Sequence, residues 1–550
     1  MKLHIDRHTA ITLFDAFPDT QQWREQLQLA GRIEVSPDAL EPSHLVFLAD
    51  HYAEQNANKH AIMRALMALP ERITADHQDL EQCLVEVIEY LYTDIIRGWL
   101  FLVDKDGALL PYAVSRIDYN ATSGEDQARI LIELKANSRA KLATQQVILT
   151  ERDLSTTSTP ASILLSKGYL KETPLLITQF DQADAQYQQW RASSGEQFSG
   201  LGTGIYAEDP SSNVRNTDWT RKPRVILSTT GTAARLVNDE SVIAQRELTL
   251  QQSGNILRTL VKKIDRNSPF TLETEKQLTR FAETDCGNAF VEIPIHGFIL
   301  MFHLELHHHL WVHVDCLAPY QYQPELKDKL VLPQEHVELI DILTADMDLL
   351  MEDIVAGKSG GTTVLCSGPP GVGKTLTAEV YAEIIERPLY RVHSGQLGLN
   401  VAEMETHLKE VLIRAQRWGA VMLIDEADVY IKRRDDNLTM NAVVGVFLRV
   451  LEYFNGLLFM TSNRLDDIDE AIISRCIAMI RYQSPNVDER AQIWQVMAQQ
   501  FGLPLAEQQT QQLAEHFPTT SGRDIKGLAK LVARFCQYRK AEPTLAIFEH

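Results

Sequence analysis

The chain has 550 residues and a formal net charge of −21, with 45% hydrophobic and 23% charged residues. This length exceeds that of one ordinary hydrophobic core, so we expect about two to four globular domains. The negative charge argues against a protein that coats nucleic acid or binds anionic membranes, because its electrostatic field repels phosphates.

Cysteine spacing and hydropathy point to the same class of protein. The six cysteines show no metal-ligand or redox spacing, and the first residues carry no signal peptide. No apolar run approaches the roughly 18 residues of a membrane helix. We therefore expect a cytoplasmic protein that does not bind membranes and for which nucleic acid is a disfavoured partner.

The first part of the chain predicts helices followed by an antiparallel sheet. Apolar residues recur at three- and four-residue spacing between Asp79 and Leu91, as in an amphipathic helix. Residues 99–103 and 109–114 are apolar and flank an Asp-Gly turn, which predicts a β-hairpin. Further strands are predicted at 129–134 and 146–150.

Two polar tracts predict surface loops or domain joints. The first is rich in glycine and serine and covers residues 193–204, and the second covers residues 209–224. A second mixed region follows them and ends near Asp315.

A histidine-rich stretch raises a metal hypothesis. Residues 298–307 and 310–314 alternate like a pair of strands, and alternate residues of a strand share one face. His303, Glu305 and His307 could therefore converge on a metal ion. We favour the alternative that these are polar positions on the open face of a hairpin.

The next stretch, residues 317–324, is extended and punctuated by proline, and it is the best candidate for a domain boundary. A helix is predicted beyond it, from about Glu335 to Met351.

The segment Gly368-Pro-Pro-Gly-Val-Gly-Lys374-Thr375 has the spacing of a phosphate-binding loop. A β-branched run, 362–366, predicts a strand before it, and residues 376–385 predict a helix after it, which is the context that this motif requires. Glycines allow backbone N–H groups to surround phosphates at the start of a helix. Lys374 would reach the β- and γ-phosphates of ATP, and Thr375 would hold Mg²⁺.

Two carboxylates follow a predicted buried strand about fifty residues later. Asp425 and Glu426 come directly after residues 421–424, at the end of the strand where parallel α/β sheets bind ligands. We expect Asp425 to hold Mg²⁺ through water, and Glu426 to act as the general base on the attacking water.

A third predicted strand, 457–460, leads to Asn463, whose amide could hydrogen-bond the γ-phosphate and the lytic water. The alternative is that this asparagine closes a turn. Arg475 lies further on, where it could reach a neighbouring subunit's nucleotide as an arginine finger in trans. The alternative for Arg475 is a surface salt bridge.

Taken together, these motifs resemble the AAA+ ATPase superfamily over residues 335–550. The resemblance implies that Asn463 is the sensor 1 residue and that Arg523, within Thr520-Ser-Gly-Arg-Asp-Ile525, is the sensor 2 arginine of a helical lid. It also implies a hexameric ring, and it places Asp353, Ile354 and Gly357 at the adenine pocket. The sequence is closest to a less-studied AAA group with Pro-Leu-Tyr-Arg-Val at 388–392.

The chain departs from AAA unfoldases at the loop that grips substrate. Residues 395–401 contain no aromatic side chain, and Leu399 is the bulkiest residue at the gripping position. Threading of a polypeptide is therefore not implied.

The resulting prediction is an α/β protein: a P-loop NTPase core with a parallel sheet and a C-terminal helical lid, preceded by α+β N-terminal domains. The predicted units are a mostly helical region 1–97, an α+β recognition or regulatory region 98–316, a linker 317–334, a large ATPase domain 335–485 and a helical lid 486–550. The predicted nucleotide contacts are Gly368, Pro369, Pro370, Gly371, Val372, Gly373, Lys374, Thr375, Leu376 and Arg523, the metal ligands are Thr375 and Asp425, and the catalytic residues are Lys374, Glu426, Asn463 and Arg475.

Three functions are compatible with these residues. The leading hypothesis is an ATP- and Mg²⁺-dependent homo-oligomer that remodels a protein bound by its N-terminal domains. The second is a nucleotide-gated scaffold or sensor, for instance in host defence, with slow hydrolysis. The third is a DNA-acting switch similar to a clamp loader, which the net charge of −21 disfavours.

Overall fold

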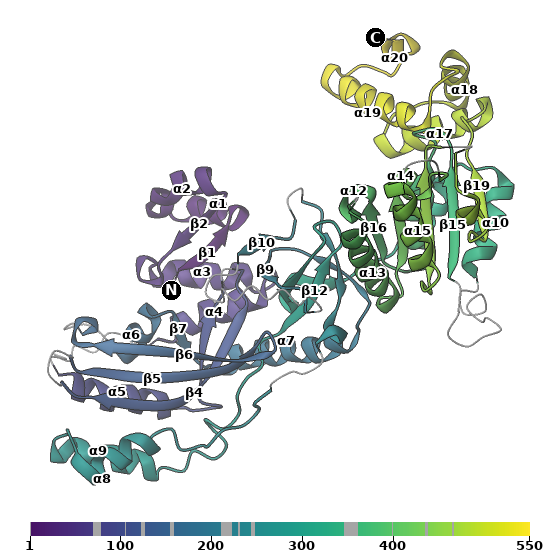
Figure 1. Cartoon of the computed structure of the whole chain (residues 1–550). Coiled ribbons are helices and arrows are strands. Elements are labelled where there is room, and N and C mark those ends of the chain that lie inside the picture. Colours follow the sequence, from purple (N-terminus) through teal and green to yellow (C-terminus); the bar gives the residue numbers. More distant parts are fainter. Residues whose placement is uncertain are drawn as a thin grey trace.

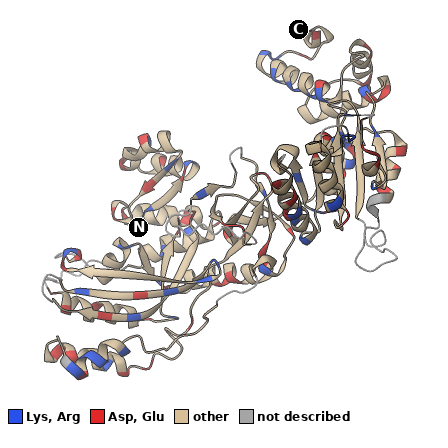
Figure 2. Ribbon diagram, in the orientation of Figure 1, with Lys and Arg blue, Asp and Glu red and all other residues tan. Residues whose placement is uncertain are grey.

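The computed structural model of the chain has an elongated shape, with the N-terminal layers at one end and the C-terminal helices at the other (Figure 1). It describes residues 2–69, 79–104, 106–122, 127–154, 159–210, 223–228, 231–243, 248–345, 361–398, 400–434, 438–464 and 467–549. Basic and acidic residues are interspersed along the ribbon in Figure 2. None of the described helices combines the length and the apolar character that crossing a membrane requires.

Helices dominate the residues before Gly98. The helix predicted between Asp79 and Leu91 is confirmed as α5, whose buried side chains face the first large sheet. Two four-residue strands, too short to show an alternating pattern, pair antiparallel and were not predicted. The elements are β1 (Leu3–Asp6), α1 (Arg7–Ala16), α2 (Arg24–Ala30), β2 (Arg32–Val35), α3 (Pro42–Tyr52), α4 (Ala57–Met67) and α5 (Leu80–Tyr92).

A five-stranded antiparallel sheet follows, in the order β6-β5-β4-β3-β7. The predicted hairpin is confirmed, since Trp99 pairs with Ala113 and Val103 pairs with Leu109. The elements are β3 (Trp99–Val103), β4 (Leu109–Asn120), β5 (Arg129–Ser138), β6 (Lys141–Thr150), α6 (Pro160–Ser166) and β7 (Tyr169–Lys171), and the later helices α8 (Arg258–Asn267) and α9 (Leu272–Glu283) also join this layer.

A seven-stranded antiparallel sheet lies next, in the order β10-β9-β13-β12-β11-β8-β14. Its elements are α7 (Pro174–Ala192), β8 (Gln197–Gly200), β9 (Thr203–Ala207), β10 (Arg224–Ile226), β11 (Ala234–Asn238), β12 (Phe298–His303), β13 (His308–His313) and β14 (Leu317–Pro319). The interpretation of the tract 193–204 as a loop was wrong, because it contains β8 and the start of β9. A Cβ on Gly200 would lie 2.6 Å from Leu236 Cδ1, so this glycine makes room for a core side chain.

The histidine hairpin is confirmed as β12 and β13, but it has no open polar face. His303 and His309 are each 2% exposed, and His313 is 4% exposed. Glu305 and His307 lie in the turn, beyond the end of β12, so they do not share a strand face with His303. No group of three or more His, Cys, Asp or Glu side chains that could hold a metal ion assembles within the described ranges.

The segment predicted as a linker is docked on both sides. Leu317–Pro319 belongs to the seven-stranded sheet as β14. Beyond it, the Tyr320 hydroxyl donates to Glu383 Oε1 at 2.8 Å and the backbone N–H of Gln323 donates to Glu383 Oε2 at 3.0 Å. A 3₁₀ turn (Pro324–Lys329) and α10 (Gln334–Ala345) follow, and the predicted continuation of this helix lies outside the described residues.

The nucleotide-binding fold predicted for the C-terminal part is present as a parallel five-stranded sheet, in the order β16-β17-β18-β15-β19. The strands are β15 (Thr362–Ser367), β16 (Leu389–His393), β17 (Val421–Asp425), β18 (Leu457–Ser462) and β19 (Ala478–Arg481). The helices are α11 (Lys374–Ile384), α12 (Ser394–Leu397), α13 (Val401–Arg417), α14 (Asp428–Ile431), α15 (Leu438–Leu451) and α16 (Glu470–Ile473).

The last helices form a layer with its own core. This lid consists of α17 (Val487–Phe501), α18 (Glu507–His516), α19 (Gly522–Arg539) and α20 (Leu545–Glu549). Its buried cluster, which includes Trp494, Leu513 and Ile525, contains lid residues alone.

The seven-stranded sheet shares a core with the parallel sheet. Val237, Phe302 and Leu304 belong to the same buried cluster as Tyr390 and Trp418. We call this contact, together with the polar groups of Asp239, Arg414 and Arg417 that surround it, the sheet junction.

The carboxylate of Asp239 is the polar centre of the sheet junction. It is fully buried and accepts hydrogen bonds from Arg417 Nε, Trp418 Nε1 and His309 Nε2, each at 2.8 Å. Burial alone would raise the pKa of Asp239, but these hydrogen bonds outweigh it and leave the pKa below its ordinary value. A second ion pair, from Arg414 to Asp209 at 2.8 Å, lies beside the Phe302 ring.

Candidate nucleotide-binding site

The predicted phosphate-binding loop connects β15 to α11, which begins at Lys374 with Gly373 as its N-cap. Gly368 and Gly371 have φ values of 151° and 81°, a region that side-chain-bearing residues rarely adopt. A Cβ on Gly368 would lie 2.5 Å from the carbonyl oxygen of Tyr482, and one on Gly371 would lie 2.6 Å from Ser521 Oγ. Glycine is therefore required at both positions, and the loop ends at a helix N-terminus, where anions bind favourably.

The ammonium group of Lys374 is held against the loop. Its Nζ donates to the carbonyl oxygens of Gly368 (2.7 Å) and Pro369 (2.6 Å) and to Asn463 Oδ1 (2.9 Å). Burial lowers the pKa of Lys374 from its ordinary value, although Asp428 and Asp425 oppose this effect. Lys374 and Asn463, which are 89 positions apart in the sequence, thus meet in the fold.

Asp425 lies at the end of β17 with both carboxylate oxygens engaged. Oδ1 accepts from Thr375 Oγ1 at 3.0 Å and from Thr461 Oγ1 at 2.5 Å, while Oδ2 accepts from Arg391 Nη2 at 2.5 Å. Burial would raise the pKa of Asp425, but Thr461 and the charge of Arg391 outweigh burial and lower it. The two predicted metal ligands are therefore neighbours, and the carboxylate is ionised.

Glu426 projects from the end of the same strand and is exposed. Its φ is 55°, in the left-handed region that is uncommon for a residue with a side chain, and its N–H donates to Thr461 Oγ1 at 3.0 Å. This backbone turns the Glu426 side chain away from the core that buries Asp425. Strained backbone of this kind concentrates at functional sites.

Asn463 follows the end of β18, and its position is fixed by Asp428. Asp428 Oδ1 accepts from the backbone N–H of Asn463 at 3.1 Å and from Ser462 Oγ at 2.5 Å. Asp428, Thr461 and Arg391 are site residues with no predicted role. The signals were present, since Thr461 adjoins a predicted strand end, Asp428 lies four residues beyond another, and Arg391 belongs to the motif at 388–392.

Of the two predicted arginines, Arg523 lies beside the phosphate-binding loop and Arg475 has its partners elsewhere. Arg475 makes an ion pair with Glu452 and donates to the carbonyl oxygen of Ala471 at 3.2 Å, so the salt bridge that we considered as its alternative exists within one chain. The side chain of Arg523 is exposed, and its backbone N–H donates to the carbonyl oxygen of Gly371 at 3.2 Å. The structure thus brings the start of the lid to the loop, but it does not bring Arg475 there.

The remaining loop residues frame the site. Val372 packs against the core beneath the sheet, while Pro370 and Leu376 are exposed. The residues expected at the adenine pocket and the gripping position, Asp353, Ile354, Gly357 and Leu399, lie outside the described residues.

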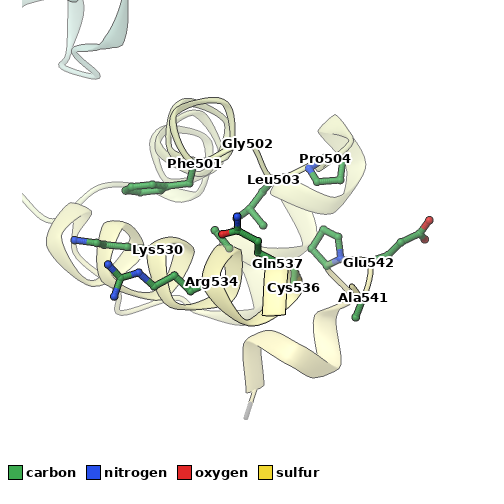
Figure 3. Close-up of a pocket in the computed structure, with 12 residues that line it drawn as sticks. Phe501, Gly502, Leu503, Pro504, Lys530, Arg534, Cys536, Gln537, Ala541 and Glu542 are labelled. Carbon is green, nitrogen blue, oxygen red and sulfur yellow. The ribbon is translucent and has the colours of Figure 1, made fainter. Parts of the chain in front are cut away.

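A separate pocket of about 590 Å³ lies within the lid (Figure 3). Lys530 and Arg534 of α19 project on one side of it, and Leu503 and Pro504 line another side. None of the predicted nucleotide-site residues lines this pocket, so it is distinct from the phosphate-binding loop.

Residues 364–484 match the family model of the ATPase family associated with various cellular activities, AAA. This part of the chain is therefore an AAA domain. The predicted resemblance and the fold class are confirmed by this match and by the parallel sheet with its helical lid.

Curated relatives are similar to part of this chain. The 26S proteasome regulatory subunit 8 of Caenorhabditis elegans is 26% identical over 239 residues, which is 41% of this chain and 54% of the relative. An uncharacterized AAA domain-containing protein of Schizosaccharomyces pombe is 30% identical over 191 residues, which is 32% of this chain and 24% of the relative. The chain thus spans about half the length of the first relative.

Among solved structures, a chain from the "Structure of E. coli MS115-1 HORMA:CdnC:Trip13 complex" aligns with 41% of this chain and 90% of its own length, at 18% identity and a TM-score of 0.34.

Proposed function

We propose that this AAA+ protein is a Mg²⁺-dependent ATPase that assembles into a ring and remodels a protein partner bound by its N-terminal region. The observation that carries the ATPase activity is the meeting of Lys374, Asn463, Thr375 and Asp425 at the carboxyl ends of three neighbouring strands. These ammonium, amide, hydroxyl and carboxylate groups lie beside a loop whose glycines have positive φ values. Such a set of groups fits a nucleoside triphosphate and a hard cation.

The donor set supports the assignment of Mg²⁺. Thr375 Oγ1 and Asp425 Oδ1 are hard oxygen donors 3.0 Å apart, and oxygen is the ligand type that Mg²⁺ prefers. When bound, the cation would neutralise phosphate charge. Lys374 would exchange its contacts with the neutral loop carbonyls for contacts with phosphate oxygens, because these carry negative charge and attract the ammonium group more strongly.

The exposed carboxylate of Glu426 would accept a proton from the attacking water. Asn463 would orient that water, since its amide is already held beside the ammonium group of Lys374. Asp425 cannot take the role of base, because both of its oxygens accept hydrogen bonds and its pKa is lowered.

Other observations support the proposals of ring assembly and of a protein partner. Relatives named as regulatory subunits of the 26S proteasome belong, by that name, to a larger assembly. The ion pair of Arg475 with Glu452 keeps its guanidinium just beyond the end of α15, from where it could exchange Glu452 for a neighbouring subunit's nucleotide. The sheet junction would transmit movement of the ring to the N-terminal sheets, which we propose as the recognition region.

The first test measures particle mass against ATP concentration together with phosphate release. We expect the wild type to form a ring and release phosphate, and Glu426→Gln to form the ring with turnover lowered by about 10²-fold or more. Lys374→Ala should lose nucleotide binding, while Glu410→Gln, an exposed carboxylate of α13, should behave like the wild type. Near-normal turnover in Glu426→Gln would refute its role as the base.

The other outcomes separate the alternative functions. Assembly of wild type and Glu426→Gln with little hydrolysis in either would favour a nucleotide-gated scaffold. Strong, salt-dependent DNA binding would favour the clamp-loader-like switch.

A mixing experiment tests the arginine finger. Arg475→Ala and Lys374→Ala should each be inactive alone, whereas mixed rings contain interfaces with an intact finger and an intact loop. We therefore expect partial recovery of phosphate release on mixing. Absence of recovery at every ratio would remove the trans role and leave Arg475 as a partner of Glu452.

A further inference from the structure

Arg391 on β16 bridges two carboxylates at the edge of the nucleotide site. Its Nη2 lies 2.5 Å from Asp425 Oδ2, and its Nη1 lies 3.3 Å from Glu379 Oε1. The Asp425 side chain is 7% exposed, while those of Arg391 and Glu379 are 39% and 40% exposed. A solvent-accessible cation therefore neutralises a carboxylate that is buried.

The fold accounts for this cluster. Strands β16 and β17 run parallel. Arg391 is paired with Leu423, and His393, two residues further along β16, is paired with Asp425. Glu379 lies on α11 four residues after Thr375, so the two side chains share a face of that helix. Arg391 thus meets the helix face and the strand end that supply the two proposed metal ligands.

Arg391 and a metal ion bound beside Thr375 would both interact with the negative charge of the Asp425 carboxylate. Thr375 and Thr461 occupy Oδ1, and Arg391 occupies Oδ2. The Arg391 guanidinium is incompletely satisfied, because its buried Nε has no hydrogen-bond partner. It has Glu379 as an alternative acceptor that is more exposed to solvent.

We propose that Arg391 is the resident counter-ion of Asp425 in the metal-free site, and that it competes with Mg²⁺ for this carboxylate. This inference rests on the proposed function, which makes Thr375 and Asp425 the metal ligands. Two cations that share one carboxylate repel each other, so each weakens the hold of the other by the same factor. Arg391 therefore stabilises the site when no divalent ion is bound and lowers its affinity for that ion. Glu379 weakens this effect, because it attracts Arg391 away from Asp425.

The test measures binding of Mn²⁺, as a spectroscopic substitute for Mg²⁺, in the presence of ADP. Arg391→Met keeps the length of the side chain but removes its charge, and we expect about tenfold tighter Mn²⁺ binding, the size of one partly screened charge-assisted hydrogen bond. Its melting temperature in a chelator should fall, and Mn²⁺ with ADP should restore most of the loss. Arg391→Lys should bind Mn²⁺ much as the wild type does.

Glu379→Gln provides a test of opposite sign that does not remove Arg391. Without Glu379, the guanidinium remains on Asp425, so Mn²⁺ binding should weaken by about threefold. In the double variant Arg391→Met/Glu379→Gln this weakening should disappear, because the competing cation is absent. Arg449→Met is the matched control, since Arg449 pairs with Glu405 on an exposed surface of the same layer.

The outcomes distinguish this inference from the proposed function. If the wild type binds no Mn²⁺ with ADP, the metal site and the competition both fail. If the wild type binds Mn²⁺ but Arg391→Met binds it equally or more weakly, the competition alone is overturned. If Arg391→Met does not fold, unchanged Mn²⁺ binding by Glu379→Gln would overturn it as well.

Discussion

The contacts of the parallel sheet with the seven-stranded sheet and with the lid differ in construction. The sheet junction is a shared hydrophobic core around the buried carboxylate of Asp239. The lid has a separate core, and it meets the phosphate-binding loop through Gly371, Ser521 and Arg523. A shared core can move only by breaking its packing, whereas a contact of a few polar groups can be remade. We therefore expect the lid to respond to nucleotide and the seven-stranded sheet to move with the parallel sheet.

The largest effect should come from Asp239→Ala. Removing this carboxylate leaves Arg417, Trp418 and His309 without their buried acceptor, so the free energy of unfolding should fall by about 3–5 kcal/mol. Urea unfolding measures the change. Asp181→Ala breaks the exposed ion pair with Arg97 and should cost less than about 1 kcal/mol. Equal losses in the two variants would show that the junction is not a stabilising core.

Glu240 makes the stability of the same region depend on pH. Burial raises the pKa of Glu240 to about 7, while its carboxylate oxygen accepts the N–H of Leu300 at 2.9 Å. Because the pKa of Glu240 is higher in the folded protein than in the unfolded chain, its neutral form stabilises the fold. This contribution is fully present at pH 4 and is lost as the pH rises to 7. The loss amounts to roughly 3 kcal/mol in total.

Glu240→Gln removes this titration and keeps an acceptor for Leu300. Between pH 5 and pH 8, the free energy of unfolding of the variant should rise by about 2–3 kcal/mol relative to the wild type. Glu196→Gln, a change at an exposed carboxylate near the same strands, is the control. A parallel pH dependence in wild type and Glu240→Gln would contradict the burial of a neutral acid.

The same contrast separates what could be predicted from the sequence from what could not. The elements around the nucleotide were predictable, because glycine spacing, apolar strands and strand-end carboxylates are local signals. The contact of Lys374 with Asn463 follows from such signals once the sheet is parallel. The sheet junction was not predictable, because Asp239, Phe302 and Trp418 come from segments that carry no shared pattern. Buried polar pairs such as His309 with Asp239 look like ordinary exposed residues in a sequence.

The prediction of a loop at residues 193–204 was wrong for a related reason. The tract 193–204 has the composition of a loop, yet Gly200 is a strand residue whose missing side chain accommodates Leu236. The contacts of residues 317–324 were equally hidden in the sequence, because the partners of Leu317 and Tyr320 lie far away in the chain. Long-range packing decided both cases.

Gly371→Ala tests the lid contact with a smaller expected effect. A methyl group here would meet Ser521 Oγ at 2.6 Å and would also strain the backbone, whereas Gly373 has a similar positive φ with no atom within 4 Å of its Cβ position. Each substitution should cost about 1 kcal/mol of backbone strain. Gly371→Ala alone should accelerate hydrogen exchange at the start of α19 in the absence of nucleotide. Equal exchange in both variants would show that the loop does not hold the lid.

Arg523→Ala should have the smallest effect on stability and the most specific effect on the lid. The side chain is exposed, so the free energy of unfolding should change by less than about 0.5 kcal/mol. If Arg523 is a sensor 2 arginine that contacts the γ-phosphate from the lid side, affinity for a non-hydrolysable ATP analogue should fall by about tenfold, while ADP affinity stays the same. Hydrogen exchange at α19 should then slow with the analogue in the wild type but not in the variant. Equal protection in both proteins would mean that the lid is held by the adenine side or by Gly371, and that the response to the γ-phosphate arises elsewhere in the site.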